Sequence, residues 1–234
     1  MKKIVFAISM ALVIGFTAAV GLCVKTLYAP KSVAATENEL LIVLDAGHGG
    51  IDGGVTGKKT GVKESDLNLA IVYRLKSRLE DIGFEVVLTR KTEAGLYGTA
   101  GKGFKKRDMQ KRKEIIQNAD PALVLSIHQN LYPSKNTRGG QVFYSKKTES
   151  GKTLALILQE KINELYSEEK VKARKAVAGD FFMLECSDCP SVIVECGFLS
   201  NEADEALLSS GAWQEKLADT ISGGVLRYFA NLSA

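Results

Sequence analysis

The sequence LLIVLDAGHGG at residues 40–50 indicates a buried β-strand that runs into a glycine-rich loop. A short, continuous apolar run that ends at glycine is typical of a strand inside a parallel sheet. The sequence ALVLSIHQN at residues 122–130 repeats this pattern, and the two histidines of the chain, His48 and His128, follow the two runs. Open α/β sheets form their binding sites at the carboxyl ends of the strands, so both histidines are candidate site residues.

Apolar runs alternate with apolar stripes of helical period along the rest of the chain. Strands are expected at residues 40–45, 84–89, 123–128, 141–144 and 191–196. Helices are expected at residues 64–82, 107–118, 150–166, 202–208 and 212–232. This order predicts an α/β fold, a three-layer sandwich in which helices flank a mostly parallel or mixed sheet.

The N-terminus predicts export. Lys2 and Lys3 precede an uncharged apolar run from residue 4 to residue 24, which is long enough to cross a bilayer. A cleaved signal peptide is the alternative, with Ser-Val-Ala at residues 32–34 as a candidate cleavage site. We therefore divide the chain into a signal peptide or membrane anchor (residues 1–30), a linker (31–38) and one exported domain (39–234), either anchored in the membrane or secreted.

The net charge of +4 belongs to the N-terminal segment. Four of the 31 lysines and arginines precede Glu37, whereas all 27 acidic residues lie from Glu37 onward, so the exported domain is neutral. A basic face over a whole domain is the usual signature of a nucleic-acid-binding protein. We therefore expect no nucleic acid as a partner.

Four residues stand out as candidates for chemistry: His48, Glu64, His128 and Glu195. The glycine-rich loop after His48 could fold back and bring Glu64, at the start of a predicted helix, beside that histidine. Two imidazoles and one carboxylate suit a single Zn²⁺ ion and leave a fourth position open. The same set would also suit Fe(II). Glu195 lies inside the apolar run VIVECGF, where burial would raise its pKa and favour a role as general acid and base.

Simpler interpretations of these residues remain open at this point. The two histidines could follow strands by chance, each bound to a nearby carbonyl group. Glu64 could be a first-turn acid that the helix dipole favours. Glu195 could be neutralised by an arginine in the core.

Five motifs appear in order along the exported domain: LDAGHGGIDGG, ESDLNLA, VVLTR, SIHQN and VIVECGFLSN. They resemble the zinc-dependent N-acetylmuramoyl-L-alanine amidases of the amidase-3 type, and the resemblance runs from about residue 40 to the C-terminus. It implies that His48, Glu64 and His128 hold one zinc ion and that Glu195 is the catalytic glutamate. Residues 39–234 would then be the amidase catalytic domain, a hydrolase that acts on peptidoglycan.

The implied reaction is hydrolysis of the amide bond between N-acetylmuramic acid and the L-alanine of the stem peptide. Asn130 is a candidate substrate-binding residue, although it could equally be a turn residue at the strand end. Arg112 matches an arginine that is common in the family, and we expect it to bind substrate. The surrounding basic run at residues 102–113 fits a solvated helix face, and contact with an anionic wall polymer or a partner is the alternative.

The small size and the N-terminal segment look like the germination-specific amidases of the spore cortex, which act before muramic-δ-lactam forms during sporulation. A vegetative amidase for cell separation or wall turnover is the alternative within the family. A catalytically inactive peptidoglycan-binding module and a zinc peptidase acting inside the stem peptide are alternatives of other classes. An activating protein partner of unknown identity is a further candidate, since ligands on loops could hold zinc weakly on their own.

The cysteines give no firm assignment. Cys186 and Cys189 have a spacing that an exported protein could use for a disulfide, and two free thiols fit the sequence at least as well. Cys196 lies in an apolar strand and is expected to be a small core residue.

Overall fold

A computed structural model describes residues 41–233 of the chain. The predicted signal peptide or anchor at residues 1–30 and the linker at residues 31–38 lie outside the described residues. Within the described part, no helix is both long enough and apolar enough to cross a membrane.

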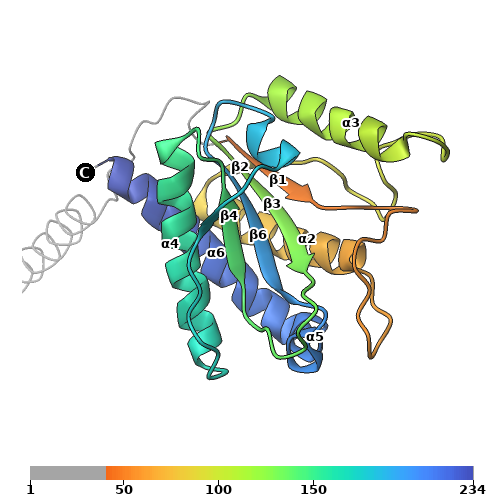
Figure 1. The fold of residues 1–234 in the computed structure, drawn as a ribbon. Coiled ribbons are helices and arrows are strands. Elements are labelled where there is room, and N and C mark those ends of the chain that lie inside the picture. The colour runs from red at the N-terminus through yellow and green to blue at the C-terminus, as the bar shows by residue number, and fades with distance from the viewer. Residues whose placement is uncertain (1–40, 234) are drawn as a thin grey trace, which may run out of the picture. The chain divides into compact units, whose positions relative to one another are not determined.

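A six-stranded sheet forms the centre of the fold, with the strand order β2-β1-β3-β6-β4-β5 (Figure 1). Its strands are β1 (Leu41–Ala46), β2 (Glu85–Leu88), β3 (Leu123–Asn130), β4 (Gln141–Tyr144), β5 (Val177–Ala178) and β6 (Ser191–Phe198). The pairs from β2 to β6 are parallel, β4 is antiparallel to β6, and β5 is parallel to β4. The prediction of a mostly parallel or mixed sheet is confirmed.

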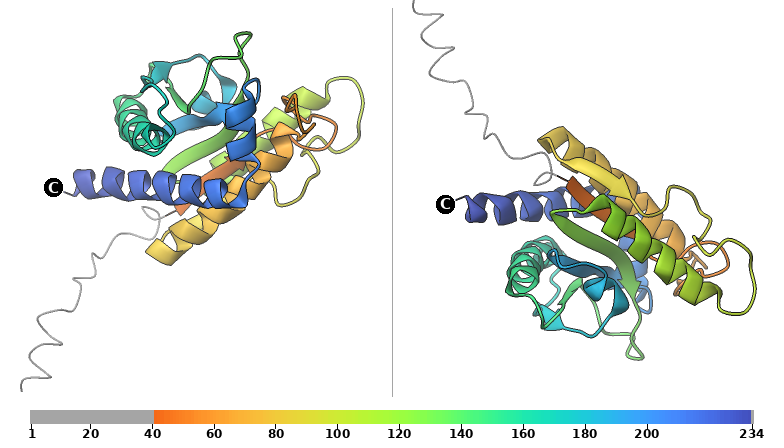
Figure 2. Two further views of the ribbon diagram at one scale, coloured as in Figure 1. Left: turned by 90° about the horizontal axis from the view of Figure 1, so that it is seen from below. Right: turned by 90° about the horizontal axis from the view of Figure 1, so that it is seen from above.

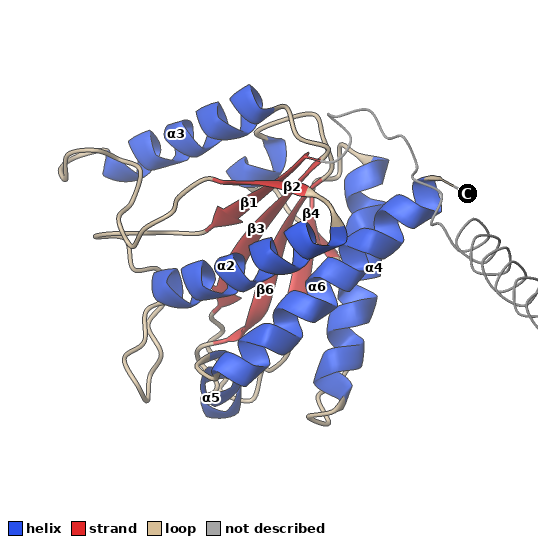
Figure 3. Ribbon diagram, turned by 180° about the vertical axis from the view of Figure 1, so that it is seen from behind, coloured by secondary structure: helices blue, strands red, loops and turns tan. Residues whose placement is uncertain are grey.

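Helices cover both faces of the sheet. They are α2 (Glu64–Ile82), α3 (Phe104–Ala119), α4 (Glu149–Ser167), α5 (Glu202–Leu208) and α6 (Gly211–Leu232), with a short 3-10 helix, η2 (Phe182–Glu185). Helices α2, α4 and α6 pack together on one face, as Figure 3 shows from that side. Helix α6 packs against α2, and the left view of Figure 2 shows the two helices crossing. On the opposite face lie α3 and η2, so the predicted three layers are present.

The two faces have cores of very different size. The large core lies under α2, α4 and α6 and includes Leu75, Leu158 and Ile221, all fully buried. The small core lies under α3 and η2 and includes Val43 and Ile116. Because side chains alternate along a strand, β1 contributes to both cores.

Several boundaries differ from the sequence-based expectation. Strands β3 and β6 each continue two residues beyond the predicted ends, and α3 begins three residues earlier than predicted. Strand β5 and helix η2 were not predicted, because segments of two and four residues are too short to show a period. Ile82, the last residue of α2, is exposed, because the helix ends there and Gly83 turns the chain with φ of 109°.

Candidate active site

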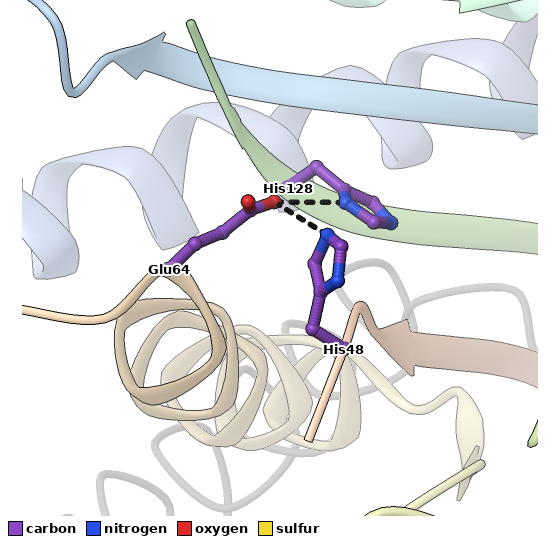
Figure 4. Close-up of side chains that lie close together, drawn as sticks. All are labelled: His48, Glu64 and His128. Atoms are coloured by element: carbon purple, nitrogen blue, oxygen red, sulfur yellow. Dashed lines mark hydrogen bonds and ion pairs between the residues drawn. The ribbon is translucent and has the colours of Figure 1, made fainter. Parts of the chain in front are cut away.

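Three predicted ligands meet at the carboxyl ends of β1 and β3 (Figure 4). His48 follows β1, His128 lies near the end of β3, and Glu64 is the first residue of α2. Glu64 Oε1 lies 3.3 Å from His48 Nε2 and 2.9 Å from His128 Nδ1. One ligand atom from each residue lies within 4.8 Å of the others. The expectation that the glycine-rich loop folds back is confirmed.

The backbone around His48 lets the side chains of His128 and Glu64 approach it closely. His48 has φ of 62°, a left-handed conformation that is uncommon for a residue with a side chain. A Cβ atom on Gly47 would lie 2.1 Å from the His128 ring, and one on Gly54 would lie 2.4 Å from Glu64 Oε2. Glycine at these two positions therefore leaves the space in which the three ligands meet.

The loop between His48 and Glu64 is also bonded to helix α5, through Lys59 and Thr60. Glu205 of α5 accepts hydrogen bonds from Thr60 Oγ1 at 2.7 Å and from Lys59 N at 3.1 Å. Closer to the site, Val55 N donates to Glu64 Oε2 at 2.8 Å. These contacts tie the loop to a helix from the C-terminal part of the chain and hold the start of α2 beside β1.

Glu64 is buried and hydrogen-bonded on several sides. Besides the histidines, it accepts a hydrogen bond from Gln129 N at 3.1 Å. Burial by itself raises the pKa of the Glu64 carboxyl, but the hydrogen bonds and charges of His128 and His48 lower it well below its ordinary value. The side chain is therefore an ionised carboxylate, the form in which it can bind a metal ion.

Arg112 does not bind substrate in the way predicted from the sequence. Its side chain is buried, and it donates to Asp45 Oδ1 at 2.5 Å, to Asp108 Oδ2 at 2.6 Å and to the backbone oxygen of His48 at 2.6 Å. The guanidinium is thus enclosed by protein groups beneath the His48 loop. The expectation of a substrate contact is wrong, because this one position of the basic run faces the sheet rather than solvent.

A second buried arginine supports the same loop. Arg90 donates to the backbone oxygens of Ala46 at 2.9 Å and of Gly47 at 3.2 Å. Together with Arg112, it binds the carbonyl groups of three consecutive residues, the last of them His48. The position of the first candidate ligand is therefore set by buried cations.

Asp45 is the buried carboxylate that pairs with Arg112. Burial raises the pKa of its carboxyl, but Arg112 and the hydroxyl groups of Ser126 and Thr89 outweigh burial and lower the pKa to about 2. Ser126 donates to Asp45 at 2.6 Å and Thr89 also at 2.6 Å. The fully buried carboxylate is thus hydrogen-bonded at both oxygens.

Glu195 lies directly beside the ligands. It is the register partner of His128 where β6 pairs with β3. Its Oε2 atom is buried without a hydrogen-bond partner, and burial raises the pKa of the carboxyl to about 7. No arginine or lysine of the described residues forms an ion pair with it, which removes the core-arginine interpretation for this part of the chain. A carboxyl group with a pKa near neutrality can take up and release a proton.

Asn130 ends β3, two residues beyond His128, as expected. Its Oδ1 atom accepts a hydrogen bond from Leu131 N at 2.8 Å, which is the geometry of a turn residue. The structure thus supports the turn role, and a contact with substrate stays a prediction.

One residue next to the ligands, Asp52, was not predicted as a site residue. Asp52 Oδ1 lies 3.2 Å from His48 Nδ1, on the ring edge that faces away from Glu64. The available signal was an acidic residue four positions after a histidine in a glycine-rich loop.

The described cysteines are free thiols. Cys186 and Cys189 form no disulfide in the structure, which agrees with the thiol alternative. Cys196 is fully buried in β6, and its assignment to the core is confirmed.

The donor set suits a zinc ion. Two imidazoles and one ionised carboxylate converge, and the donors are of the types that catalytic zinc sites use. The buried Oε2 atom of Glu195 beside them has no hydrogen-bond partner, so a reacting water molecule or a substrate group could bond to it. Fold and site together define an α/β protein with a candidate single-metal centre at the carboxyl edge of its sheet.

The comparison with known proteins identifies the family. Residues 42–227 match the model of the N-acetylmuramoyl-L-alanine amidase family, Amidase_3. The chain belongs to this family, whose members act on peptidoglycan. The resemblance drawn from the five sequence motifs is thereby confirmed.

Individual relatives give the same result. The chain is 33% identical over 192 residues to the germination-specific N-acetylmuramoyl-L-alanine amidase of Bacillus subtilis, covering 81% of this chain and 79% of the relative. It resembles the CwlD amidase of Clostridioides difficile, solved in complex with the GerS lipoprotein, with 36% identity and a TM-score of 0.77 over 81% of this chain and 98% of that one. An N-acetylmuramoyl-L-alanine amidase from Clostridium difficile 630 matches with 28% identity and a TM-score of 0.71, over 82% of this chain and 98% of that one.

Proposed function

We propose that the chain is a zinc-dependent amidase that cleaves the bond between N-acetylmuramic acid and the L-alanine of the stem peptide. His48, Glu64 and His128 would hold one zinc ion, and Glu195 would be the catalytic acid and base. The observation that carries this proposal is the convergence of three ligand atoms within 4.8 Å, with the unbonded carboxyl of Glu195 on the neighbouring strand.

The residues divide the chemistry between them. A bound zinc ion supplies Lewis-acid chemistry, which polarises a carbonyl group and makes a water molecule more acidic. Glu195 accepts a proton from the attacking water at its unbonded Oε2 atom and then delivers it to the leaving amine of L-alanine. Asn130, at the end of β3, would bind a carbonyl group of the substrate through its amide nitrogen.

The raised pKa of Glu195 fits both halves of this cycle. A carboxyl group with a pKa near 7 has a substantial basic fraction at neutral pH. Once protonated, it is also a stronger hydrogen-bond donor to the leaving nitrogen than water. Both properties follow from burial beside the candidate metal centre.

We further propose that this activity serves the spore cortex during sporulation and is needed for germination. Support comes from the 33% identity to a germination-specific amidase and the 36% identity to CwlD. The lipoprotein in the CwlD complex supports a protein partner for this chain as well. We also propose that the chain is exported and is either anchored in the membrane through residues 1–30 or secreted after their removal.

The reaction is tested by mass spectrometry of muropeptides after the full-length chain is incubated with peptidoglycan. Stem peptides with a free L-alanine amino group are expected with zinc and not with a chelator. Cleavage between amino acids of the stem would instead indicate a peptidase. Zinc binding without any cleavage, with or without added partner, would favour the binding-module alternative.

The cellular role needs a separate experiment. Deletion of the gene is expected to leave vegetative growth normal and to abolish muramic-δ-lactam in the spore cortex. Chains of unseparated vegetative cells with normal cortex muropeptides would contradict the spore assignment and favour a role in cell separation.

A further inference from the structure

We propose that Asp52 is a positioning residue that orients the His48 ring toward the metal. This inference rests on the proposed zinc site, since it assigns a role toward that site to a residue outside the ligand set. Three features of the structure support this role: the contacts of the two ring nitrogens, the exposure of His48 in a glycine-rich loop and the bonds that hold Asp52 itself.

The two nitrogens of the His48 ring have different partners. Nε2 lies 3.3 Å from Glu64 Oε1, and Nδ1 lies 3.2 Å from Asp52 Oδ1. Without a metal ion, Glu64 favours a proton on Nε2. Asp52 can likewise only accept a hydrogen bond, and it favours the tautomer of a neutral His48 that has the proton on Nδ1. The lone pair is then on Nε2, the atom that faces the other ligands. Asp52 thereby stabilises the tautomer that can bind a metal ion.

His48 needs this support more than His128 does. His128 lies within β3, paired with β1 on one side and β6 on the other. His48 lies in a loop beside Gly47, Gly49 and Gly50, which offer no side chains, and a quarter of its own side chain is exposed. Arg112 fixes the backbone oxygen of His48, but this contact leaves the ring free to rotate. The ring contacts the His128 ring edge-on and Glu64 at Nε2, and Asp52 is the partner that it has at Nδ1.

Asp52 is itself held in place. Its backbone forms a two-way bridge with Gly49, with hydrogen bonds of 2.8 Å and 3.2 Å, which returns the chain beneath the His48 ring. Gly54 N donates to Asp52 Oδ1 at 3.3 Å, and Lys105 Nζ lies 3.5 Å from Oδ2. Both carboxylate oxygens thus have partners, so the Asp52 side chain is ordered before any metal binds.

A carboxylate that bonds to a ligating histidine, without touching the metal itself, has a measurable effect on metal binding. Removing such a partner of a ligating histidine typically weakens metal affinity about 10–100-fold. The experiment measures the zinc dissociation constant of the full-length chain by competition with a chromophoric chelator. Wild type is compared with Asp52→Ala, Asp52→Asn and the matched control Asp66→Asn, which removes an exposed charge near Glu64 without a contact to either histidine.

We expect Asp52→Ala to weaken zinc binding about 10–100-fold. Asp52→Asn should weaken it less, because the amide oxygen can still accept from Nδ1. Asp66→Asn should remain within about twofold of the wild type, as a surface charge has little effect. Circular dichroism should show the same fold for all four proteins. The Asn variant keeps the test valid if Asp52→Ala disturbs the loop.

A second measurement reports which nitrogen of the His48 ring carries the proton. The chain has two histidines, so nitrogen-15 spectra of labelled protein contain few ring signals, and His128→Ala assigns them. Without zinc, Asp52→Ala should shift the proton of His48 from Nδ1 toward Nε2 relative to the wild type, because only Glu64 then accepts from the ring. Unchanged zinc affinity and tautomer in Asp52→Ala would overturn the inference. Failure of the wild type to bind zinc would instead overturn the proposed function.

Discussion

The two faces of the sheet are buried by different chemistry. Under α2, α4 and α6, apolar side chains form a large continuous core. Under α3, a small apolar cluster lies beside a buried ionic network of Asp45, Arg112 and Asp108. The ionic network reaches the backbone of a candidate ligand through the hydrogen bond from Arg112 to His48. The apolar face carries Glu64 at the start of α2, and the polar face fixes the loop that carries His48.

Strand β1 shows how one segment serves both faces. Leu44 points into the large core, while the next residue, Asp45, points to the α3 side and binds Arg112. The chain then leaves the sheet, and the buried arginines bind the next three carbonyl groups. A strand end with apolar groups on both faces would pack well but would offer nothing to fix the loop that carries His48.

The largest loss of stability is expected on the polar face. Arg112→Met leaves Asp45 buried without its cationic partner, which typically costs about 3–5 kcal/mol of folding free energy. Zinc affinity should fall as well, because the His48 loop loses its support. Urea unfolding and zinc titration measure the two effects. Lys111→Met, at an exposed position of the same helix, is the control and should change neither. Stability of Arg112→Met equal to this control would refute the role of the network.

The matched change on the apolar face separates stability from site geometry. Leu75→Ala creates a cavity in the large core and is expected to cost about 2–4 kcal/mol. Leu156→Ala, at an exposed position of α4, should cost about 0.5 kcal/mol or less. Neither should alter the zinc affinity of the folded protein. A loss of zinc affinity in Leu75→Ala would show that the two faces are not independent.

Acid should lower the stability of the fold mainly through Asp45, on the polar face of the sheet. The pKa of Asp45 is about 2 in the folded protein and near 3.8 when unfolded, so its ionisation stabilises the fold above about pH 4. This contribution, about 2 kcal/mol, is lost as pH falls through the folded pKa. Urea unfolding between pH 5 and pH 2 should therefore show a steeper decline for the wild type than for Asp45→Asn. Parallel curves would contradict the assignment.

The smallest effect on activity is expected from Asn130, at the carboxyl end of β3. Asn130→Ala removes one neutral hydrogen bond to substrate, worth about 1 kcal/mol, so kcat/KM should fall roughly fivefold. Zinc affinity should stay unchanged. Steady-state kinetics on soluble muropeptides measure the first quantity. An unchanged kcat/KM would leave Asn130 with the turn role that its contact to Leu131 shows.

Much of the fold follows from local patterns in the sequence. The bounds of α2, β4 and α5 agree with the sequence-based expectation, because apolar runs and stripes are local signals. The four residues at the centre were also predicted, since histidines after apolar runs and a glutamate within one are unusual. Three of them meet within 4.8 Å, and the fourth lies on the adjacent strand.

The residues that support the site could not be predicted in the same way. Arg112 pairs with Asp45, 67 positions away, and nothing local distinguishes it from its exposed basic neighbours on α3. Its role depends on which side of the helix faces the sheet. The role of Asp52 depends on the bridge with Gly49 that turns the loop back. Both contacts are set by tertiary structure.

The most direct test of the account is the cleavage rate of Glu195→Gln measured together with its zinc affinity. The substitution keeps the size of the side chain and removes its ability to take up a proton. We predict that Glu195→Gln keeps the wild-type zinc affinity and loses cleavage roughly 10²–10⁴-fold, the usual contribution of a general base. Cleavage at the wild-type rate by the zinc-loaded variant would contradict this prediction.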